Sequence, residues 1–188
     1  MRGISLSAML VVMSAFMLSS CSYYSANQAS TSRYAASPPK ASQPKPNYAA
    51  RMPQKITPRG EKVVVVDPSV HAWGAYGPDG TLIRGGLATA GSSWCPDIKR
   101  PCRTKVGTFR INSLGSAKCK SSKYPLPRGG APMPYCMFFN GHQGLHGSYN
   151  VVDGNESHGC VRMHVEDAEW LRFNFARVGT KVIVWPYN

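Results

Sequence analysis

After residue 60, the apolar residues fall into short runs of strand length that are separated by glycine, proline and polar residues. The run at 62–67 contains four consecutive valines, and the run at 72–76 is joined by a Gly-Pro-Asp-Gly turn to 81–84. β-Branched and aromatic runs bounded by turn residues are typical of strands, and the second pair predicts a hairpin. Three further strands are predicted at 107–111, 135–139 and 181–185.

One segment has a helical pattern instead. Over 165–177, Ala168, Leu171 and Phe175 recur at helical spacing, and acidic residues occupy the first turn. Strands separated by Gly/Pro turns, with one short helix near the C-terminus, predict a mainly β domain over 61–188.

The first 20 residues differ in character from this domain. A basic start and an apolar stretch over 4–18 are typical of a secretory signal peptide, and the stretch is too short for a comfortable membrane span. Leu-Ser-Ser before Cys21 resembles the lipobox of bacterial lipoproteins, which implies that Cys21 is lipidated and anchors the chain in a membrane. Ser22 favours the outer membrane, with the domain facing the periplasm. A plain signal peptide before a chance cysteine is the alternative.

Residues 21–60 predict a tether between the anchor and the domain. Residues 22–60 contain six prolines, are rich in Ser, Ala and Lys, and show no apolar period. Such a segment has little to bury, so we expect a disordered spacer.

The charge excludes one class of partner. The chain has 22 Lys+Arg against 9 Asp+Glu, a net charge of +13, but these residues are spread along the sequence. A nucleic-acid surface usually shows clustered basic residues. We therefore expect no nucleic-acid partner.

The cysteines predict two disulfides and one free thiol. If Cys21 is lipidated, five cysteines remain in the exported domain, and an odd number cannot all pair. Four paired cysteines allow three connectivities, of which we favour the bridges between sequence neighbours. A zinc site is the alternative, although no Cys-x-x-Cys spacing supports it, and we expect no metal. The favoured bridges are Cys95–Cys102 and Cys119–Cys136, which leave Cys160 free.

Histidines and glycines surround this free cysteine in the sequence. His146 and Gly147 precede a Ser-His-Gly-Cys segment that ends at Cys160. An imidazole can take the proton of a thiol and form an ion pair, which activates sulfur as a nucleophile. Gly159 lets backbone amides approach a developing oxyanion. A buried structural cysteine and an ordinary core histidine are the alternatives for each residue taken singly.

This pattern resembles the L,D-transpeptidases with a YkuD-type catalytic domain. The carried motif is His-Gly-Ser over 146–148 followed by Ser-His-Gly-Cys-Val-Arg over 157–162, and the resemblance spans most of 61–188. It implies a β-sandwich or mixed sheets, no cofactor, and cysteine acyl transfer on peptidoglycan stem peptides. The cross-link formed would join two diaminopimelate residues (3–3).

The resemblance also implies a role for each motif residue. Cys160 would be the nucleophile and His146 the base, oriented through its other ring nitrogen by the Gly147 carbonyl. The amides of Cys160 and Gly159 would form the oxyanion hole. The remaining motif residues are expected to shape the pocket or bind substrate: His158, Ser148, Ser157 and Arg162.

The sequence departs from the family pattern in two places. Ten residues separate His146 from Ser157, fewer than usual, and Lys105 replaces a customary proline. The loop over 92–103 also carries two cysteines, which is unusual for the family. Several alternatives remain open: an envelope protein or a free D-amino acid as acyl acceptor, hydrolysis of a protein–peptidoglycan link, and a non-catalytic peptidoglycan-binding lipoprotein.

Overall fold

In a computed structural model of the chain, residues 46–188 are described. The predicted signal peptide, the predicted lipidation site Cys21 and the first part of the predicted tether lie outside these residues. Within 46–188, none of the helices has the length and apolar character to span a bilayer.

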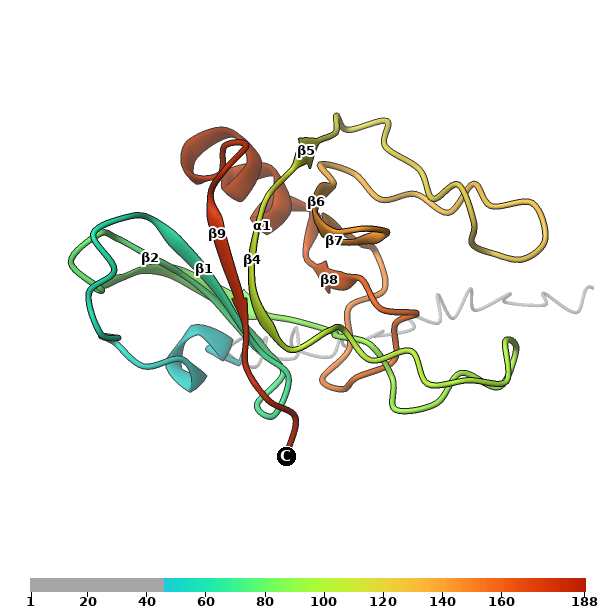
Figure 1. Ribbon diagram of the computed structural model, residues 1–188, viewed down its shortest axis with the longest axis horizontal. Helices are drawn as coiled ribbons and strands as arrows, with labels where there is room; N and C mark the ends of the chain where they lie inside the picture. The colour runs from blue at the N-terminus through green and yellow to red at the C-terminus, as the bar shows by residue number, and fades with distance from the viewer. Residues whose placement is uncertain (1–45) are drawn as a thin grey trace, which may run out of the picture. The chain divides into compact units, whose positions relative to one another are not determined.

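Five strands form the larger sheet, in the order β3-β2-β1-β9-β4 (Figure 1). Strands β1 and β9 run parallel, whereas the other neighbours are antiparallel. The hairpin predicted from the Gly-Pro-Asp-Gly turn is β2–β3. The strands are β1 (Val63–Asp67), β2 (Ala72–Tyr76), β3 (Leu82–Leu87), β4 (Gly107–Arg110) and β9 (Lys181–Val184).

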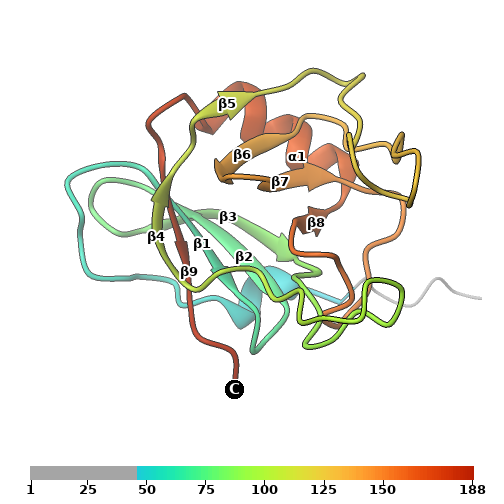
Figure 2. The same ribbon diagram turned by 45° about the vertical axis from the view of Figure 1, so that its right-hand side comes forward.

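The smaller sheet contains residues from both halves of the motif. Its order is β5-β6-β7-β8, and β7 and β8 run parallel (Figure 2). The chain leaves β8 directly into α1 (Val165–Trp170), which continues as a single π-helical turn, η2 (Leu171–Phe175). The strands are β5 (Ser113–Leu114), β6 (Met137–Asn140), β7 (Gln143–Gly147) and β8 (Val161–Met163).

The four valines of β1 face two different apolar clusters. Val64 and Val66 join the main core, to which both sheets and the helix contribute. Val63 and Val65 join a smaller cluster with Met52. Alternate residues of a strand point to opposite faces, so burial on both faces explains why this run is apolar throughout instead of alternating.

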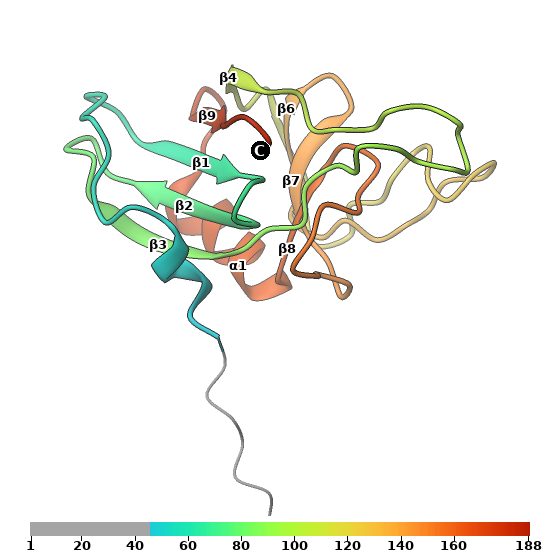
Figure 3. The ribbon, with the colours of Figure 1, turned by 90° about the horizontal axis from the view of Figure 1, so that it is seen from below.

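The smaller cluster corrects the predicted start of the domain. Residues before 61 were expected to form a tether, but η1 (Tyr48–Arg51) packs against β2 and β3, and Met52 is buried. The Gln54 carbonyl accepts a hydrogen bond from Leu82 N–H at 3.0 Å, on the edge strand. The prediction missed this segment because the average composition of residues 22–60 is polar, although Met52 contributes a buried apolar side chain. Figure 3 shows η1 beside β3, where the described chain enters.

The mainly β architecture with one short C-terminal helix is confirmed. Each predicted strand is present, with boundary shifts of a few residues, and the helical segment begins at Val165 as expected but ends at Phe175. Strands β5, β7 and β8 were not predicted, because they are short or contain the glycines and polar residues of the motif.

Candidate active site

Parallel pairing of β7 with β8 brings the two halves of the motif together. The register places His146 of β7 opposite Arg162 of β8, and Cys160 immediately precedes β8. Residues 148–160 form a loop that leaves β7 and leads back into the neighbouring strand β8. His146 and Cys160 therefore line one pocket although they are fourteen positions apart.

The imidazole of His146 is held in one tautomer. Its Nδ1 lies 2.8 Å from the carbonyl oxygen of Gly147, the contact that the family resemblance implied. Because a carbonyl only accepts, Nδ1 carries the hydrogen and Nε2 keeps the lone pair. Burial, together with the Arg162 charge, lowers the pKa of His146 to about 4. The ring is thus a neutral base at neutral pH.

The thiol of Cys160 is also neutral at rest. Burial of its surroundings raises its pKa above the ordinary value, although the Gly144 amide and the Arg162 charge work in the opposite direction. Its Sγ lies 3.3 Å from the carbonyl oxygen of His142, which accepts the S–H. The thiolate–imidazolium pair that the sequence suggested is therefore not the resting state, since burial disfavours the charged form of both groups.

Ser157 fixes the turn that presents Cys160. Its buried hydroxyl donates to the Cys160 carbonyl and accepts from Gly159 N–H at 3.0 Å. This gives Ser157 a positioning role within the loop. It also corrects the expected oxyanion hole, because the Gly159 amide is already bonded; of the two expected amides, that of Cys160 remains. Gly159 has φ +117°, a conformation that favours glycine.

Two further side chains hold the segment before β4 in place: Thr104 ties it to this turn, and Gln143 ties it to β7. The hydroxyl of Thr104 donates to the Gly159 carbonyl at 2.9 Å and accepts from the Gly91 amide at 3.0 Å. Gln143 Oε1 accepts from Lys105 N–H at 3.0 Å. Proline has no N–H, so lysine in place of the family's usual proline makes this link possible.

The short loop between His146 and Ser157 is braced from outside. Thr89 bonds both the N–H and the carbonyl of Val152, at 2.8 and 2.7 Å. Asp153 forms a bidentate ion pair with Arg51, with N–O distances of 2.6 and 2.7 Å, and its Oδ1 also contacts His71 Nδ1. Arg51 belongs to the segment predicted as tether, so that segment supports the site.

Two disulfides close the loops beside the site, with the pairing favoured from the sequence: Cys95–Cys102 and Cys119–Cys136. Among the described cysteines, Cys160 is the free one. Bridging of the other four leaves no thiolates for the alternative zinc site. Both loops extend from the side of the molecule that carries β7 and β8, as Figures 1 and 3 show.

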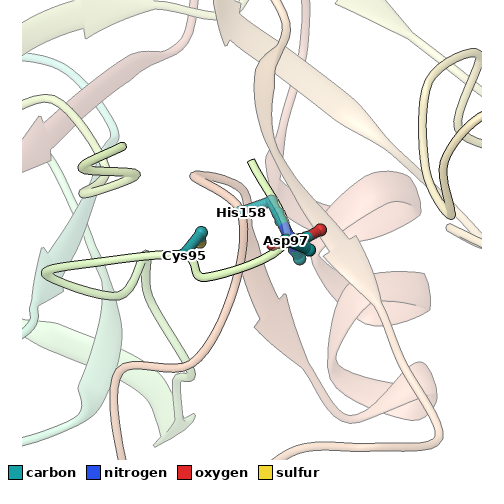
Figure 4. A group of neighbouring side chains, drawn as sticks. All are labelled: Cys95, Asp97 and His158. Atoms are coloured by element: carbon teal, nitrogen blue, oxygen red, sulfur yellow. Dashed lines mark hydrogen bonds and ion pairs between the residues drawn. The ribbon is translucent and has the colours of Figure 1, made fainter. Parts of the chain in front are cut away.

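His158 joins these two loops. Its Nε2 lies 2.8 Å from a carboxylate oxygen of Asp97, in the first loop, and its ring packs on Tyr124 of the second at 4.3 Å between centroids. Figure 4 shows Asp97 meeting His158, with Cys95 nearby. The potential metal-ligand atoms of these three side chains lie within 4.8 Å of one another. Because the Cys95 sulfur is bonded to Cys102, only two ligands remain, fewer than a zinc site requires.

The pocket containing Cys160 and His146 has a volume of about 610 Å³. Arg162 lines it, as does Ser148, whose hydroxyl also bonds the backbone of Asn150. Gly147 lies where a Cβ would approach Val165 at 3.0 Å, so close packing explains this glycine.

Four residues of this network were not singled out from the sequence as site residues: Asp97, Thr104, Tyr124 and Gln143. Their roles depend on contacts between distant segments, and the sequence carries no local signal for such contacts. The cysteines on either side of Asp97 were the nearest indication that its loop is ordered.

Comparison with known families identifies the domain. The family described as the L,D-transpeptidase catalytic domain (YkuD) matches residues 61–184, which is more than half of the chain. The chain belongs to the L,D-transpeptidase family. The family acts on peptidoglycan stem peptides, and membership supports transpeptidase activity. A comparison with curated proteins found no match.

Solved L,D-transpeptidases share the fold. The L,D-transpeptidase from Xylanimonas cellulosilytica is 23% identical, with a TM-score of 0.61 over 73% of this chain and 66% of that one. The enzyme from Mycobacterium smegmatis is 23% identical, with a TM-score of 0.55 over 67% and 59%. L,D-transpeptidase 3 from Mycobacterium tuberculosis, in complex with a faropenem-derived adduct, is 23% identical, with a TM-score of 0.53 over 66% and 60%. This L,D-transpeptidase thus spans less than two thirds of each neighbour's length.

Proposed function

We propose that this L,D-transpeptidase forms 3–3 cross-links by two-step acyl transfer through Cys160. One observation carries the proposal: a free thiol and a neutral imidazole, fixed with its Nε2 lone pair available, line the same pocket. A nucleophile and an oriented base that face the same pocket are the groups that covalent acyl transfer requires.

In the first step, the Cys160 sulfur attacks the carbonyl that joins diaminopimelate to the terminal D-Ala of a tetrapeptide stem. His146 Nε2 takes the thiol proton as the S–C bond forms, so the thiolate arises during attack and not beforehand. The Cys160 amide stabilises the oxyanion. The C–N bond then breaks, His146 returns the proton to the leaving amine, D-Ala departs and a thioester remains.

In the second step, the side-chain amine of diaminopimelate on a neighbouring stem attacks the thioester. His146 accepts a proton from this amine and delivers it to the departing sulfur. The free thiol is restored and a 3–3 amide bond is formed. The two steps need no cofactor, because the Cys160 sulfur is the nucleophile of the first step and the amine of the acceptor stem is the nucleophile of the second.

We also propose that the enzyme works from the cell envelope. Lipidated Cys21 would anchor it, facing the periplasm and most simply on the outer membrane, and the residues before η1 would let the domain reach a fixed polymer. The apolar stretch over 4–18, Cys21 and Ser22 support this placement.

The cross-linking proposal is tested by mixing the purified protein with disaccharide tetrapeptides and resolving the products by mass spectrometry. We expect 3–3 dimers and one released D-Ala per dimer, with neither in Cys160→Ala. Tripeptide product without dimers would indicate hydrolysis and contradict cross-linking. Loss of 3–3 dimers from the muropeptides of a deletion strain would support the same activity in cells.

A further inference from the structure

Four basic side chains line the pocket that contains Cys160: Arg100, Lys120, Lys123 and Arg162. No aspartate or glutamate is among the lining residues. Among residues 46–188, none of these four cations takes part in an ion pair. Within the described residues, the one ion pair that involves a lining residue is that of Asp97 with His158, and the four cations remain unpaired.

Three arginines outside the pocket are used differently. Arg51, Arg84 and Arg110 each contact a carboxylate at 2.6 to 2.8 Å. These pairs join the N-terminal segment, β3 and β4 to neighbouring elements, which is a structural use of charge. The pocket cations have no such partner, and uncompensated like charges in one concave site favour an anionic ligand.

The four cations come from separate segments that the fold brings together. Arg100 lies in the loop closed by Cys95–Cys102, whereas Lys120 and Lys123 lie in the loop closed by Cys119–Cys136. Figures 1 and 3 show these two loops on the side of the molecule that carries β7 and β8.

The fourth cation, Arg162, lies next to the reacting groups. It is opposite His146 in the β7–β8 register, and its charge lowers the pKa of both His146 and Cys160. Positive charge therefore lines the site from the reacting pair to the two loops.

We infer that this pocket selects stem peptides whose carboxylates are free and discriminates against stems on which they are amidated. The inference rests on the proposed function, which supplies the peptide. Conversion of a carboxylate to a carboxamide keeps nearly the same shape but removes the negative charge and the charge-assisted hydrogen bonds. Each such bond lost in a partly closed site lowers kcat/KM by roughly tenfold to a hundredfold.

The test uses two synthetic tetrapeptide donors that differ only in carrying free carboxylates or carboxamides beside the reacting carbonyl. D-Ala release is measured with one fixed amine acceptor. We expect wild type to prefer the free-carboxylate donor at least tenfold in kcat/KM, with a preference that falls as salt is added. The double variant Lys120→Ala/Lys123→Ala should lose most of this preference.

Lys118→Ala is the matched control, because Lys118 lies in the same surface segment, is exposed and does not line the pocket. It should retain the full preference. Equal kcat/KM for the two donors in wild type, or an undiminished preference in the double variant, would overturn the inference while leaving acyl transfer intact. Release of D-Ala from neither donor, with no acylation of Cys160, would instead overturn the proposed function.

Discussion

At the scale of single residues, one pocket holds a neutral thiol and a neutral base. Desolvation opposes a resting charge on either Cys160 or His146, and it lowers the pKa of the imidazole to about 4. The half-buried Cys160 thiol stays neutral at rest, and in the proposed mechanism it becomes a thiolate only as it attacks a carbonyl. Reactivity then depends on substrate and not on pH alone.

The raised pKa of Cys160 and the lowered pKa of His146 predict how the rate of Cys160 alkylation varies with pH. Iodoacetamide reacts with the thiolate, so the rate at Cys160 should rise about tenfold per pH unit from pH 6 to about pH 9, without a plateau. The rate of acylation, measured as D-Ala release in a single turnover without acceptor, should remain nearly flat down to about pH 5, since the pKa of His146 lies near 4 and the base stays unprotonated above it. A fast, pH-independent alkylation rate at neutral pH would reveal a resting ion pair and contradict the neutral site.

Ser157 is expected to matter through position. Ser157→Ala removes the bonds to the Cys160 carbonyl and the Gly159 amide, and we expect it to lower D-Ala release at least tenfold and stability by about 1–3 kcal/mol. Ser116→Ala is the control, because its hydroxyl accepts a hydrogen bond from Lys118 N–H in an exposed turn and does not line the pocket, and it should cost less in both measurements. If both variants matched wild type in kinetics and urea unfolding, the positioning role would be wrong.

At the scale of elements, the turn that presents Cys160 is held by other segments and not by a helix or strand of its own. Thr104 ties it to the chain before β4, which Gln143 in turn ties to β7, and His158 connects the two disulfide-closed loops. The disulfides restrict both loops, so these contacts are made at a lower cost in chain entropy.

Loss of the Asp97 contact should loosen this arrangement. Asp97→Asn removes the negative charge that faces His158, and we expect a several-fold fall in kcat/KM together with faster amide exchange over 157–160. Asp79→Asn makes the same chemical change in the β2–β3 turn and should alter neither quantity. Unchanged exchange in Asp97→Asn would show that the contact does not order the turn.

The N-terminal segment makes a separate contribution to stability. A chain starting at residue 46 retains η1 and buried Met52, whereas a chain starting at residue 61 exposes the small cluster around Val63 and Val65. Loss of such a side chain costs about 2–4 kcal/mol, so the shorter chain should melt roughly 10 °C lower. Identical melting temperatures by circular dichroism would mean that residues 46–60 are not part of the domain.

The elements also show how far sequence reasoning reaches. The valine run, the turn before β3 and the spacing over 165–177 predicted their elements, because each signal is local. Strands β7 and β8 were not predicted, because motif residues such as His146, Gly147 and Arg162 interrupt their apolar pattern. The motif located Cys160 and His146, but Asp97 and Tyr124 depend on loop contacts that only the folded chain defines.

At the scale of the whole molecule, the pocket proposed for acyl transfer is also lined by basic side chains. The described residues place the reacting pair, the basic side chains and the disulfide-closed loops together on one side of the fold. Stem peptides are anionic oligopeptides attached to a polymer, so the charge, the shape of the site and the proposed anchor at Cys21 suit the same substrate.

The central claim is that the Cys160 sulfur carries the acyl group, and intact mass measures this most directly. Wild type and Cys160→Ala are incubated with a donor tetrapeptide without acceptor and quenched in acid. The account predicts that wild type gains the mass of the donor minus D-alanine, and that Cys160→Ala gains nothing. Release of D-Ala by wild type without a covalent adduct, or the same adduct on Cys160→Ala, would contradict it.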